Sequence, residues 1–585
     1  WMDRDTEGLI QMGGEGVDWV SHAMFTKVPH VFQNLGDGTY YHSGYLAVRQ
    51  AIAANANITY KILFNDAVAM TGGQPVDGTI TVDGIARQVE AEGATKVVVL
   101  SDDIAKYDAV RAKFPAGTEF FDRAELDAVQ RRLREMKGVT ILIYEQTCAA
   151  EKRRRRKKGE LVDPARRLFI NDRVCEGCGD CSVQSNCISV EPLETEFGRK
   201  RQINQSTCNK DMSCLKGFCP SFITVEGGQL RKKARDKALS PFALAALPEP
   251  EIAQLQAVNG EVWGIVVAGV GGTGVITIGQ LLGMAAHIEG KGIVTQDAAG
   301  LAQKGGATWS HALIGESQDA IRTTRVGTAA ADLILAADPL VAINAETLAR
   351  MREGRTHVAL NTHSTPTAAF VRNANWVNPQ DDCANEIARA VGIDNLGAFD
   401  ADAFAVALMG DSLYANPMLL GFAWQRGWLP LEYESLMRAI DLNNVAIDNN
   451  KTAFEWGRRA AHDLASVQML VSPGQVIEFK KRETIESLVK RRVNFLTAYQ
   501  NAAYAEQYKS FVAKVQQSES SLVVGKTSLT EAVARYLFKL MAYKDEYEVA
   551  RLLLSPEAKA AAVAVGGKGA KVTWQLHPPL LRALG

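Results

Sequence analysis

Seven of the nine cysteines in this 585-residue sequence lie in one short segment, between Cys175 and Cys219. A disulfide-bonded secreted protein of this length would spread its cysteines along the chain, whereas thiols gathered in one segment are typical of metal or cluster ligation. The other two, Cys148 and Cys383, have no partner pattern nearby and are expected to be buried apolar side chains. The segment therefore predicts a small domain organised by inorganic ligands.

The first run of this segment has the spacing of a bacterial ferredoxin. Cys175, Cys178 and Cys181 are each separated by two residues, which lets three thiolates close around one cubane. Cys187 follows after five residues, where ferredoxins have three. A zinc ribbon is the alternative, but it needs only two CxxC pairs and does not explain the third cysteine.

The second run repeats the spacing with one change. Cys208, Asp211 and Cys214 are again two residues apart, and Cys219-Pro220 follows. In two-cluster ferredoxins the last cysteine of each run ligates the other cluster. On that rule cluster one takes Cys175, Cys178, Cys181 and Cys219, and cluster two takes Cys187, Cys208, Asp211 and Cys214. A carboxylate binds iron less firmly than a thiolate here, so we expect an Asp-ligated [4Fe–4S] cluster or one that loses iron to become [3Fe–4S].

The N-terminal part of the chain alternates apolar strands with helical segments. Such alternation predicts a parallel α/β sheet, whose ligands bind at the carboxyl ends of the strands. The expected strands are 30–35, 60–64, 96–100 and 139–144, with a helix over about 43–54.

Polar residues follow two of these strands at a separation that suits a diphosphate site. Gly36-Asp37-Gly38-Thr39 comes directly after the first strand, and Asn65 ends the second, with 26 residues between Gly38 and Asn65. Side-chain oxygens of Asp37 and Asn65 and the carbonyl of Ala67 are ligands that Mg²⁺ accepts, and glycines let a backbone approach phosphates closely. Gly-Asp-Gly alone is also a common turn.

The order Gly-Asp-Gly, then Asn-Asp-Ala-Val-Ala-Met-Thr-Gly-Gly-Gln, then a ferredoxin run resembles the 2-oxoacid:ferredoxin oxidoreductases, in particular the fused-chain indolepyruvate type. The resemblance implies thiamine diphosphate as cofactor, with Asp37 and Asn65 as Mg²⁺ ligands. Met70 stands where pyruvate-type relatives have Asn, a departure that concerns the contacts near the thiazolium and not the metal site.

A glycine loop in the third block permits two functional interpretations, and a purely structural tight turn is the remaining alternative. Gly269, Gly271, Gly272 and Gly274 follow an expected strand at 262–267 and precede an expected helix at 275–287. This pattern is typical of a dinucleotide site, for which Asp297 is the candidate ribose ligand. The resemblance implies instead the gamma domain of the family, with Gln303-Lys304-Gly305-Gly306 as its later glycine segment and contact with substrate or coenzyme A. Both interpretations keep the loop as a cofactor-binding candidate.

The whole chain is expected to be an α/β multidomain protein. The predicted domains are a thiamine-diphosphate-binding parallel-sheet domain (1–150), a basic linker (151–166), a two-cluster ferredoxin-like domain (167–230), a second linker (231–258), an α/β gamma domain (259–462) and a helical C-terminal region (463–585). The seven consecutive basic residues at 152–158 are interpreted as solvated linker, with a docking patch for an acidic ferredoxin as the alternative.

Net charge −1 and the lack of a long apolar run give no indication of a nucleic-acid or membrane protein. The resemblance implies oxidative decarboxylation of a 2-oxoacid such as an aryl pyruvate, with coenzyme A as co-substrate, ferredoxin as acceptor, a homodimer and a cytoplasmic location. The activating Glu of the family belongs to a pyrimidine-binding domain that precedes this region, so the sequence is expected to be a fragment and its catalytic base is unknown. The alternatives are an NAD(P)-linked iron–sulfur oxidoreductase and a non-catalytic electron-transfer module.

Overall fold

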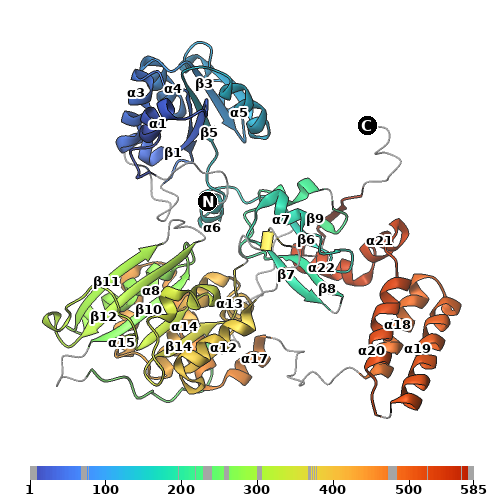
Figure 1. The fold of residues 1–585 in the computed structure, drawn as a ribbon. Helices are drawn as coiled ribbons and strands as arrows, with labels where there is room; N and C mark the ends of the chain where they lie inside the picture. Colours follow the sequence, from blue (N-terminus) through green and yellow to red (C-terminus); the bar gives the residue numbers. More distant parts are fainter. Residues whose placement is uncertain are drawn as a thin grey trace. The chain divides into compact units, whose positions relative to one another are not determined.

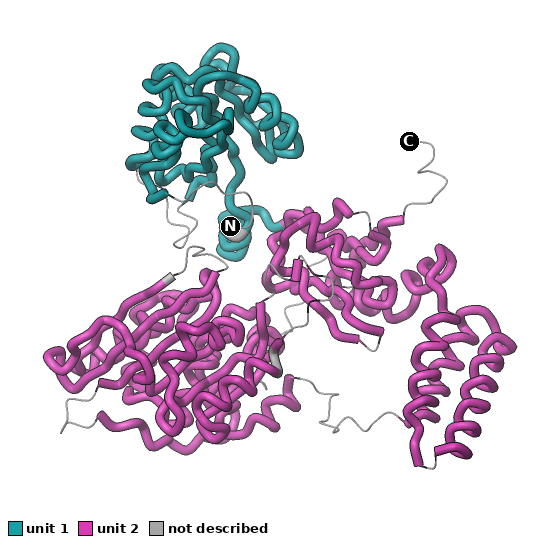
Figure 2. Tube along the Cα trace, viewed as in Figure 1, with its two compact units in different colours: residues 1–163 teal, residues 164–585 magenta. Residues whose placement is uncertain are grey.

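The structure is a computed structural model that describes residues 10–576. Within this range it does not describe residues 68–75, 77, 79, 196, 218, 228–239, 256–261, 300–305, 366–369, 372, 374–375, 377–378, 472–483, 524 and 568. The chain divides into two compact units, residues 1–163 and 164–585 (Figure 2). Among the described helices, none combines the length and the apolar character that a membrane crossing requires.

The first unit contains the expected parallel sheet, with the strand order β1-β2-β5-β3-β4 (Figure 1). Its strands are β1 (Val31–Gly36), β2 (Ile58–Phe64), β3 (Lys96–Ser101), β4 (Glu119–Asp122) and β5 (Val139–Glu145). The central strands are buried on both faces, which explains why they read as continuous apolar runs. The short strand β4 was not predicted, because its four residues carry charges at both ends.

Helices cover the two faces of this sheet with different strand residues. On one face, α3 (Tyr45–Ala53) and α4 (Val82–Ala91) pack against a core that includes Ile141 and Ile143 of β5. On the other face, α5 (Leu126–Arg134) packs against Leu142. This alternation leaves the carboxyl ends of β1 and β2 next to each other at one edge of the sheet.

The consecutive basic residues, which the sequence assigns to a linker, form a helix. The helix α6 (Ala149–Lys158) consists mainly of Ala, Glu, Lys and Arg, which are strong helix formers. Glu151 pairs with Arg154 at 3.0 Å and with Arg155 at 3.3 Å, one turn further along. Gly159 then ends the helix with φ of 80°, a conformation that glycine adopts without strain.

The second unit begins with the cysteine-rich segment. Its elements are β6 (Arg166–Ile170), α7 (Asp180–Ser185), β7 (Val190–Thr195), β8 (Gly198–Ile203) and β9 (Phe222–Glu226). Strands β7 and β8 form a hairpin, and β6 pairs antiparallel with β9. Three thiols, those of Cys175, Cys181 and Cys214, lie in one apolar core with strands β6 and β9, and those of Cys187 and Cys219 pack against it.

A six-stranded sheet follows, in the order β11-β12-β10-β13-β14-β15. Its strands are β10 (Trp263–Val270), β11 (Gly292–Ala299), β12 (Ala307–Gly315), β13 (Leu333–Ala336), β14 (His357–Asn361) and β15 (Leu396–Phe399). Strands β10, β13, β14 and β15 are parallel, whereas β12 runs antiparallel to both of its neighbours. Helix α8 (Val275–Ile288) follows β10, as the sequence predicts.

The C-terminal region is helical, as expected, and the last element that the structure describes there is a strand. The helices are α17 (Leu464–Val471), α18 (Ile485–Tyr499), α19 (Ala502–Leu522), α20 (Ser528–Met541), α21 (Glu546–Leu553) and α22 (Pro556–Gly566). Strand β16 (Lys571–Trp574) pairs with β9 in the sheet of the cysteine-rich segment. A part of the expected helical region therefore belongs to that sheet. Four residues are too few to show a strand period.

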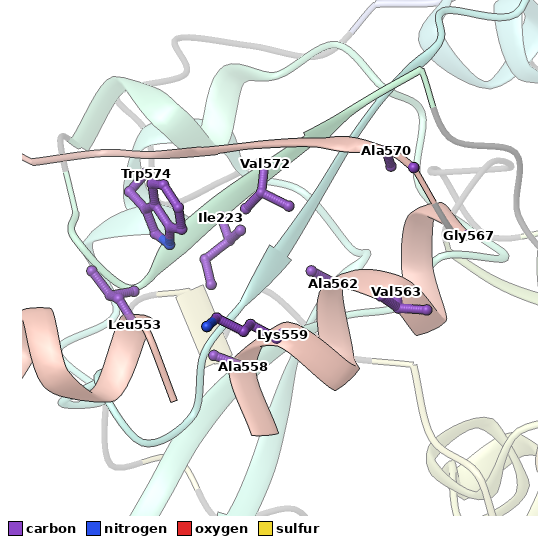
Figure 3. A pocket seen from close by; sticks show the side chains of 11 residues that line it. Ile223, Leu553, Ala558, Lys559, Ala562, Val563, Gly567, Ala570, Val572 and Trp574 are labelled. Carbon is purple, nitrogen blue, oxygen red and sulfur yellow. The ribbon is translucent and has the colours of Figure 1, made fainter. Parts of the chain in front are cut away.

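An apolar cavity of about 260 Å³ lies where this added strand meets the helices (Figure 3). Ile223, Val572 and Trp574 from the sheet face Ala558 and Ala562 of α22 across it. Its walls are mainly hydrocarbon, with Lys559 as a charged side chain among the lining residues, and ligand sites need several convergent polar groups. We therefore interpret the cavity as imperfect packing between strand and helix.

Candidate functional site

Asp37 lies directly after β1 and connects the ends of two neighbouring parallel strands. Its Oδ2 accepts the backbone N–H groups of Asn65 at 2.8 Å and Asp66 at 3.0 Å, both just past β2, and its Oδ1 accepts that of Gly38 at 2.8 Å. The residue is 3% exposed, and burial raises the pKa of its carboxyl while these N–H donors oppose the shift. The carboxylate is thus held in one orientation at a place where a cation would compensate its burial.

The loop after β2 brings the second expected Mg²⁺ ligand to the same edge. Asn65 Oδ1 accepts the N–H of Ala67 at 3.3 Å, and Ala67 is 1% exposed. A Cβ added to Gly36 would meet no atom within 4 Å, so there is open space beside this part of the backbone. These oxygen donors and the adjoining space fit a Mg²⁺-diphosphate group. Met70 and the segment Thr71–Gln74 lie outside the described residues.

The chain continues from Asp37 as one helical stretch with an unusual turn. Helix α2 (Asp37–Thr39) includes Thr39 and passes into a π-helical turn (Tyr40–Gly44), which passes into α3. Single π-helical turns occur mostly at functional sites, because they let a helix change its side-chain register locally. The turn follows the Gly-Asp-Gly motif immediately, which agrees with a binding role for this edge.

Asp66 and Arg155 form a link to this loop that the sequence did not indicate. Asp66 has φ of 57°, in the left-handed region that non-glycine residues seldom adopt. Arg155 of α6 donates Nη1 and Nη2 to its two carboxylate oxygens, each at 3.0 Å. A bidentate pair has a defined geometry, so α6 helps to hold the residue between Asn65 and Ala67. The separation of 89 positions between the partners hides this contact in the sequence.

The thiols assigned to cluster one lie close to one another. Burial, followed by the charge of the Cys175 thiol and the smaller effects of Cys219 and Cys178, raises the pKa of the Cys181 thiol to about 11. Cys219 belongs to the second run, yet Cys175 and Cys178 are the thiols that act on it. The fold therefore brings the last cysteine of the second run to the first run, as the ferredoxin rule requires.

The groups assigned to cluster two are gathered in the same way. Burial, and then the charges of Cys187, Cys208 and Asp211, raises the pKa of the Cys214 thiol to about 12. Cys187 belongs to the first run, so the exchange of last cysteines is reciprocal. Thiols packed this closely are costly to ionise on their own, and bound iron removes that cost.

The two ligand loops share one backbone conformation. At the second and fourth positions after the first cysteine, Gly177 and Gly179 have φ of 72° and 86°, and Lys210 and Met212 have φ of 55° and 60°. Left-handed backbone costs a side-chain-bearing residue roughly 1–2 kcal/mol. Lys210 and Met212 retain it, so the second loop follows the path of the first despite having no glycine at these positions.

Equivalent hydrogen bonds and exposure complete the likeness of the loops. Gly177 donates its N–H to Cys175 Sγ at 3.3 Å, and Lys210 donates its N–H to Cys208 Sγ at 3.4 Å. Cys178 is exposed, and so is Asp211 at the matching position of the second loop. Amide N–H groups aimed at sulfur are a means of tuning iron–sulfur clusters. Zinc would instead need its ligands at roughly 2.3 Å from one ion. Within the described ranges, no three His, Cys, Asp or Glu side chains are placed to hold a single metal ion.

The cysteines outside the segment differ in burial. Cys383 is buried, as the sequence predicts, and Cys148 is half-buried, immediately before α6.

The backbone conformation of the loop after β10 favours glycine at several of its positions. Gly272 and Gly274 have φ of 90° and 97°, and a Cβ on Gly269 would lie 2.8 Å from Val275 Cγ2. Gly271 donates its N–H to the carbonyl of Gly306 at 2.8 Å. The loop leads into α8, whose N-cap has no side-chain hydrogen bond. Gln303, Lys304 and Gly305 lie outside the described residues.

The order of strands around this loop differs from that of a dinucleotide-binding fold. In that fold the strand bearing the ribose-binding acid lies parallel and next to the strand before the glycine loop. Here Asp297 is on β11, and β12 lies between β11 and β10 and runs antiparallel to both. Asp297 itself pairs with Ser310 of β12. The NAD(P) interpretation therefore lacks the strand arrangement on which it depends.

Comparisons with known proteins agree with a redox role. Residues 264–460 match the family described as pyruvate ferredoxin/flavodoxin oxidoreductase, and residues 485–585 match a family of unknown function, DUF6537. The chain is 33% identical over 201 residues to indolepyruvate oxidoreductase subunit IorB of Methanothermobacter thermautotrophicus, which covers 34% of this chain and 97% of that subunit. It is 29% identical over 162 residues to subunit IorA of Thermococcus kodakarensis, covering 27% of this chain and 23% of that subunit.

One solved structure of an oxidoreductase subunit matches a similar share of the chain. It is the gamma subunit of a keto/oxoacid ferredoxin oxidoreductase from Geobacter sulfurreducens, with 24% identity, 34% of this chain, 98% of that chain and a TM-score of 0.24. The relatives in sequence define the class of the protein as an oxidoreductase. The chain belongs to the 2-oxoacid:ferredoxin oxidoreductase family. It spans nearly all of the IorB relative and less than a quarter of the IorA relative.

Proposed function

We propose that this chain takes part in the oxidative decarboxylation of a 2-oxoacid to acyl-CoA and CO₂, with electrons leaving through two iron–sulfur clusters to ferredoxin. The observation that supports it best is Asp37, a buried carboxylate held between two strand ends by three backbone N–H groups. Such an anion suits a Mg²⁺-diphosphate group, and the same chain carries two thiol groups of ferredoxin spacing.

Each residue of the N-terminal edge has a definable task. Asp37, the side-chain oxygen of Asn65 and the carbonyl of Ala67 would hold Mg²⁺, while Gly36 and Gly38 leave room for the diphosphate. Thiamine diphosphate, when bound, supplies the electron sink that allows CO₂ to leave the 2-oxoacid. The chain's own contribution is to fix the diphosphate end of that group, since a misplacement of about 1 Å is costly in catalysis.

The thiols would carry the electrons away one at a time. Cluster one would be held by Cys175, Cys178, Cys181 and Cys219, and cluster two by Cys187, Cys208, Asp211 and Cys214. The glycine loop at 269–274 would lie against substrate or coenzyme A, because free N–H groups at a helix N-terminus suit a phosphate.

Substrate and partners follow from the family and the names of the relatives. We propose an aryl pyruvate such as indolepyruvate as substrate and ferredoxin as acceptor, in a homodimer. We propose that a pyrimidine-binding domain supplies the activating Glu. The oxygen sensitivity of such clusters is the basis for expecting a cytoplasmic location.

The decisive experiment measures bound cofactors and 2-oxoacid-dependent reduction together. The protein is purified without oxygen, and viologen or ferredoxin reduction is followed with indolepyruvate, pyruvate and 2-oxoglutarate, alone and with an IorA-type polypeptide. We expect iron, sulfide and Mg²⁺-dependent thiamine diphosphate binding, and reduction that depends on 2-oxoacid and coenzyme A. Tightly bound NAD without thiamine would overturn the proposal, and clusters without any thiamine binding would indicate an electron-transfer module.

Replacement of Asp211 by cysteine tests the assignment of cluster two. Asp211→Cys supplies a softer fourth ligand, so we expect a stable [4Fe–4S] cluster where the parent protein readily gives a [3Fe–4S] signal on oxidation. EPR of the oxidised and reduced proteins measures this directly. Asp180→Cys is a matched control, because Asp180 lies in the first run but in no ligand position. Identical spectra for Asp211→Cys and the parent would contradict the assignment.

A further inference from the structure

The cysteine-rich segment contains a buried cation that its ligand pattern does not require. Arg201 of β8 is 1% exposed, one of the largest side chains that the fold buries so completely. Its guanidinium lies over the ring of Phe370, 4.1 Å from the ring centroid, and Phe370 is itself 1% exposed. Burying a charge costs several kcal/mol unless opposite charge compensates it. A positive group in this position therefore calls for negative charge nearby.

The strand that carries Arg201 packs against the first ligand loop. A Cβ placed on Gly177, between Cys175 and Cys178, would lie only 2.1 Å from the carbonyl oxygen of Arg199, two residues before Arg201 on β8. Glycine is thus required there, because the loop and the strand backbone approach too closely for a side chain. The contact places β8 directly beside the thiols assigned to cluster one.

The charges that act on Arg201 point to the same thiols. Burial lowers the pKa of Arg201, and the thiols of Cys181 and Cys175 are the largest influences that oppose this shift. The influence is mutual, because Arg201 opposes the upward shift in the pKa of Cys181. Charges of both signs lie beside the other thiol group, because the pKa of the Cys208 thiol is raised by burial and by the carboxylate of Asp211 and is lowered by the ammonium of Lys210. What distinguishes Arg201 beside the first thiol group is therefore its burial, and not the sign of its charge.

We propose that Arg201 raises the reduction potential of the cluster held by Cys175, Cys178, Cys181 and Cys219, and so makes that cluster the easier of the pair to reduce. This inference rests on the proposed function, because it requires the clusters. Reduction adds one electron and hence one negative charge to the cluster. A guanidinium fixed beside it in a water-poor interior stabilises the reduced form more than the oxidised form. Arg201 would affect electron transfer only through its charge beside the cluster, without itself contacting the substrate.

The experiment is an EPR-monitored potentiometric titration of the full chain, purified without oxygen. Arg201→Met removes the charge at similar volume, and Arg201→Lys keeps it. We expect the methionine variant to shift the redox equilibrium of cluster one toward the oxidised form by at least tenfold, about 59 mV for a one-electron couple. The lysine variant should shift it by less than threefold, and cluster two should change little in both. The cluster-one signal is identified as the one that Cys219→Ser removes.

A buried arginine elsewhere provides the control for lost packing. Arg492 of α18 is 3% exposed and stacks 4.1 Å from the ring centroid of Phe538, in the helical region. Arg492→Met should lower thermal stability as Arg201→Met does but leave both potentials unchanged. If Arg201→Met fails to retain cluster one while Arg201→Lys retains it, the requirement for charge is supported.

The possible failures are distinct. An unchanged potential in Arg201→Met, or equal shifts in the methionine and lysine variants, overturns the inference and leaves the proposed function standing. Loss of cluster one in both variants also overturns it, because the guanidinium is then needed for structure. A parent protein without iron–sulfur signals overturns the proposed function together with the inference.

Discussion

Replacement of Asp37 by alanine is expected to abolish Mg²⁺-dependent binding of thiamine diphosphate and to leave the iron–sulfur absorption unchanged. The variant removes a ligand oxygen and the buried negative charge that a divalent cation would compensate. We expect Kd to rise by roughly 100-fold or more, at the upper end of the effect of losing a supporting group at a metal site. Isothermal titration with thiamine diphosphate and Mg²⁺ gives the affinity, and visible absorption gives the cluster content.

Two controls separate metal binding from folding in this experiment. Asp37→Ala leaves the N–H groups of Asn65, Asp66 and Gly38 without their acceptor, which costs about 1–3 kcal/mol for each donor that stays buried and unpaired. Asp37→Asn keeps one acceptor oxygen, so it should melt at a higher temperature than the alanine variant and still bind the cofactor weakly. Asp127→Ala changes an exposed carboxylate of the same unit and should have no effect. Unchanged affinity in Asp37→Ala would remove the main support for a thiamine site.

Replacement of Cys219 should remove the cluster of the first run, although Cys219 follows the second run in sequence. Cys219→Ser and Cys187→Ser should each lose about half of the bound iron, because each cysteine completes one of two clusters. The two variants should lose different EPR signals. Iron and sulfide analysis, with EPR of the reduced protein, measures both effects.

Double variants test the exchange of ligands directly. Cys219→Ser combined with Cys175→Ser should lose no more iron than Cys219→Ser alone, because both residues serve one cluster. Cys219→Ser combined with Cys214→Ser should lose nearly all of it. Cys383→Ala, at a buried cysteine outside the segment, should retain full iron content. The opposite pattern in the two double variants would show that each run holds its own cluster.

The strands and helices that position the site were predictable because their signals are local. The apolar runs at 60–64 and 139–144 coincide with β2 and β5, and the helical pattern at 275–287 coincides with α8. The helical conformation of the basic run was not predicted, since its charge suggested a solvated linker. Helix propensity and the pairs of Glu151 with the following arginines make it a helix instead.

The candidate site was predictable only where the ligands themselves carry the pattern. The spacing of the cysteines and the separation of Asp37 from Asn65 indicated which residues would meet, and the structure brings these groups together. Their roles as iron and Mg²⁺ ligands stay predictions. The left-handed backbone at Lys210 had no signal, because the residue expected in that conformation is glycine.

By itself, the sequence of this protein determined which residues are candidate ligands and the succession of α/β, cysteine-rich and helical regions, because spacing and periodicity are properties of neighbouring residues. Only the tertiary structure decided that Arg155 holds Asp66, that β12 separates Asp297 from the glycine loop, and that β16 returns to the sheet of the cysteine-rich segment. It also placed Arg201 beside the first thiol group. These contacts join residues far apart in the chain, and they form because buried charges and strand edges need partners that no local pattern specifies.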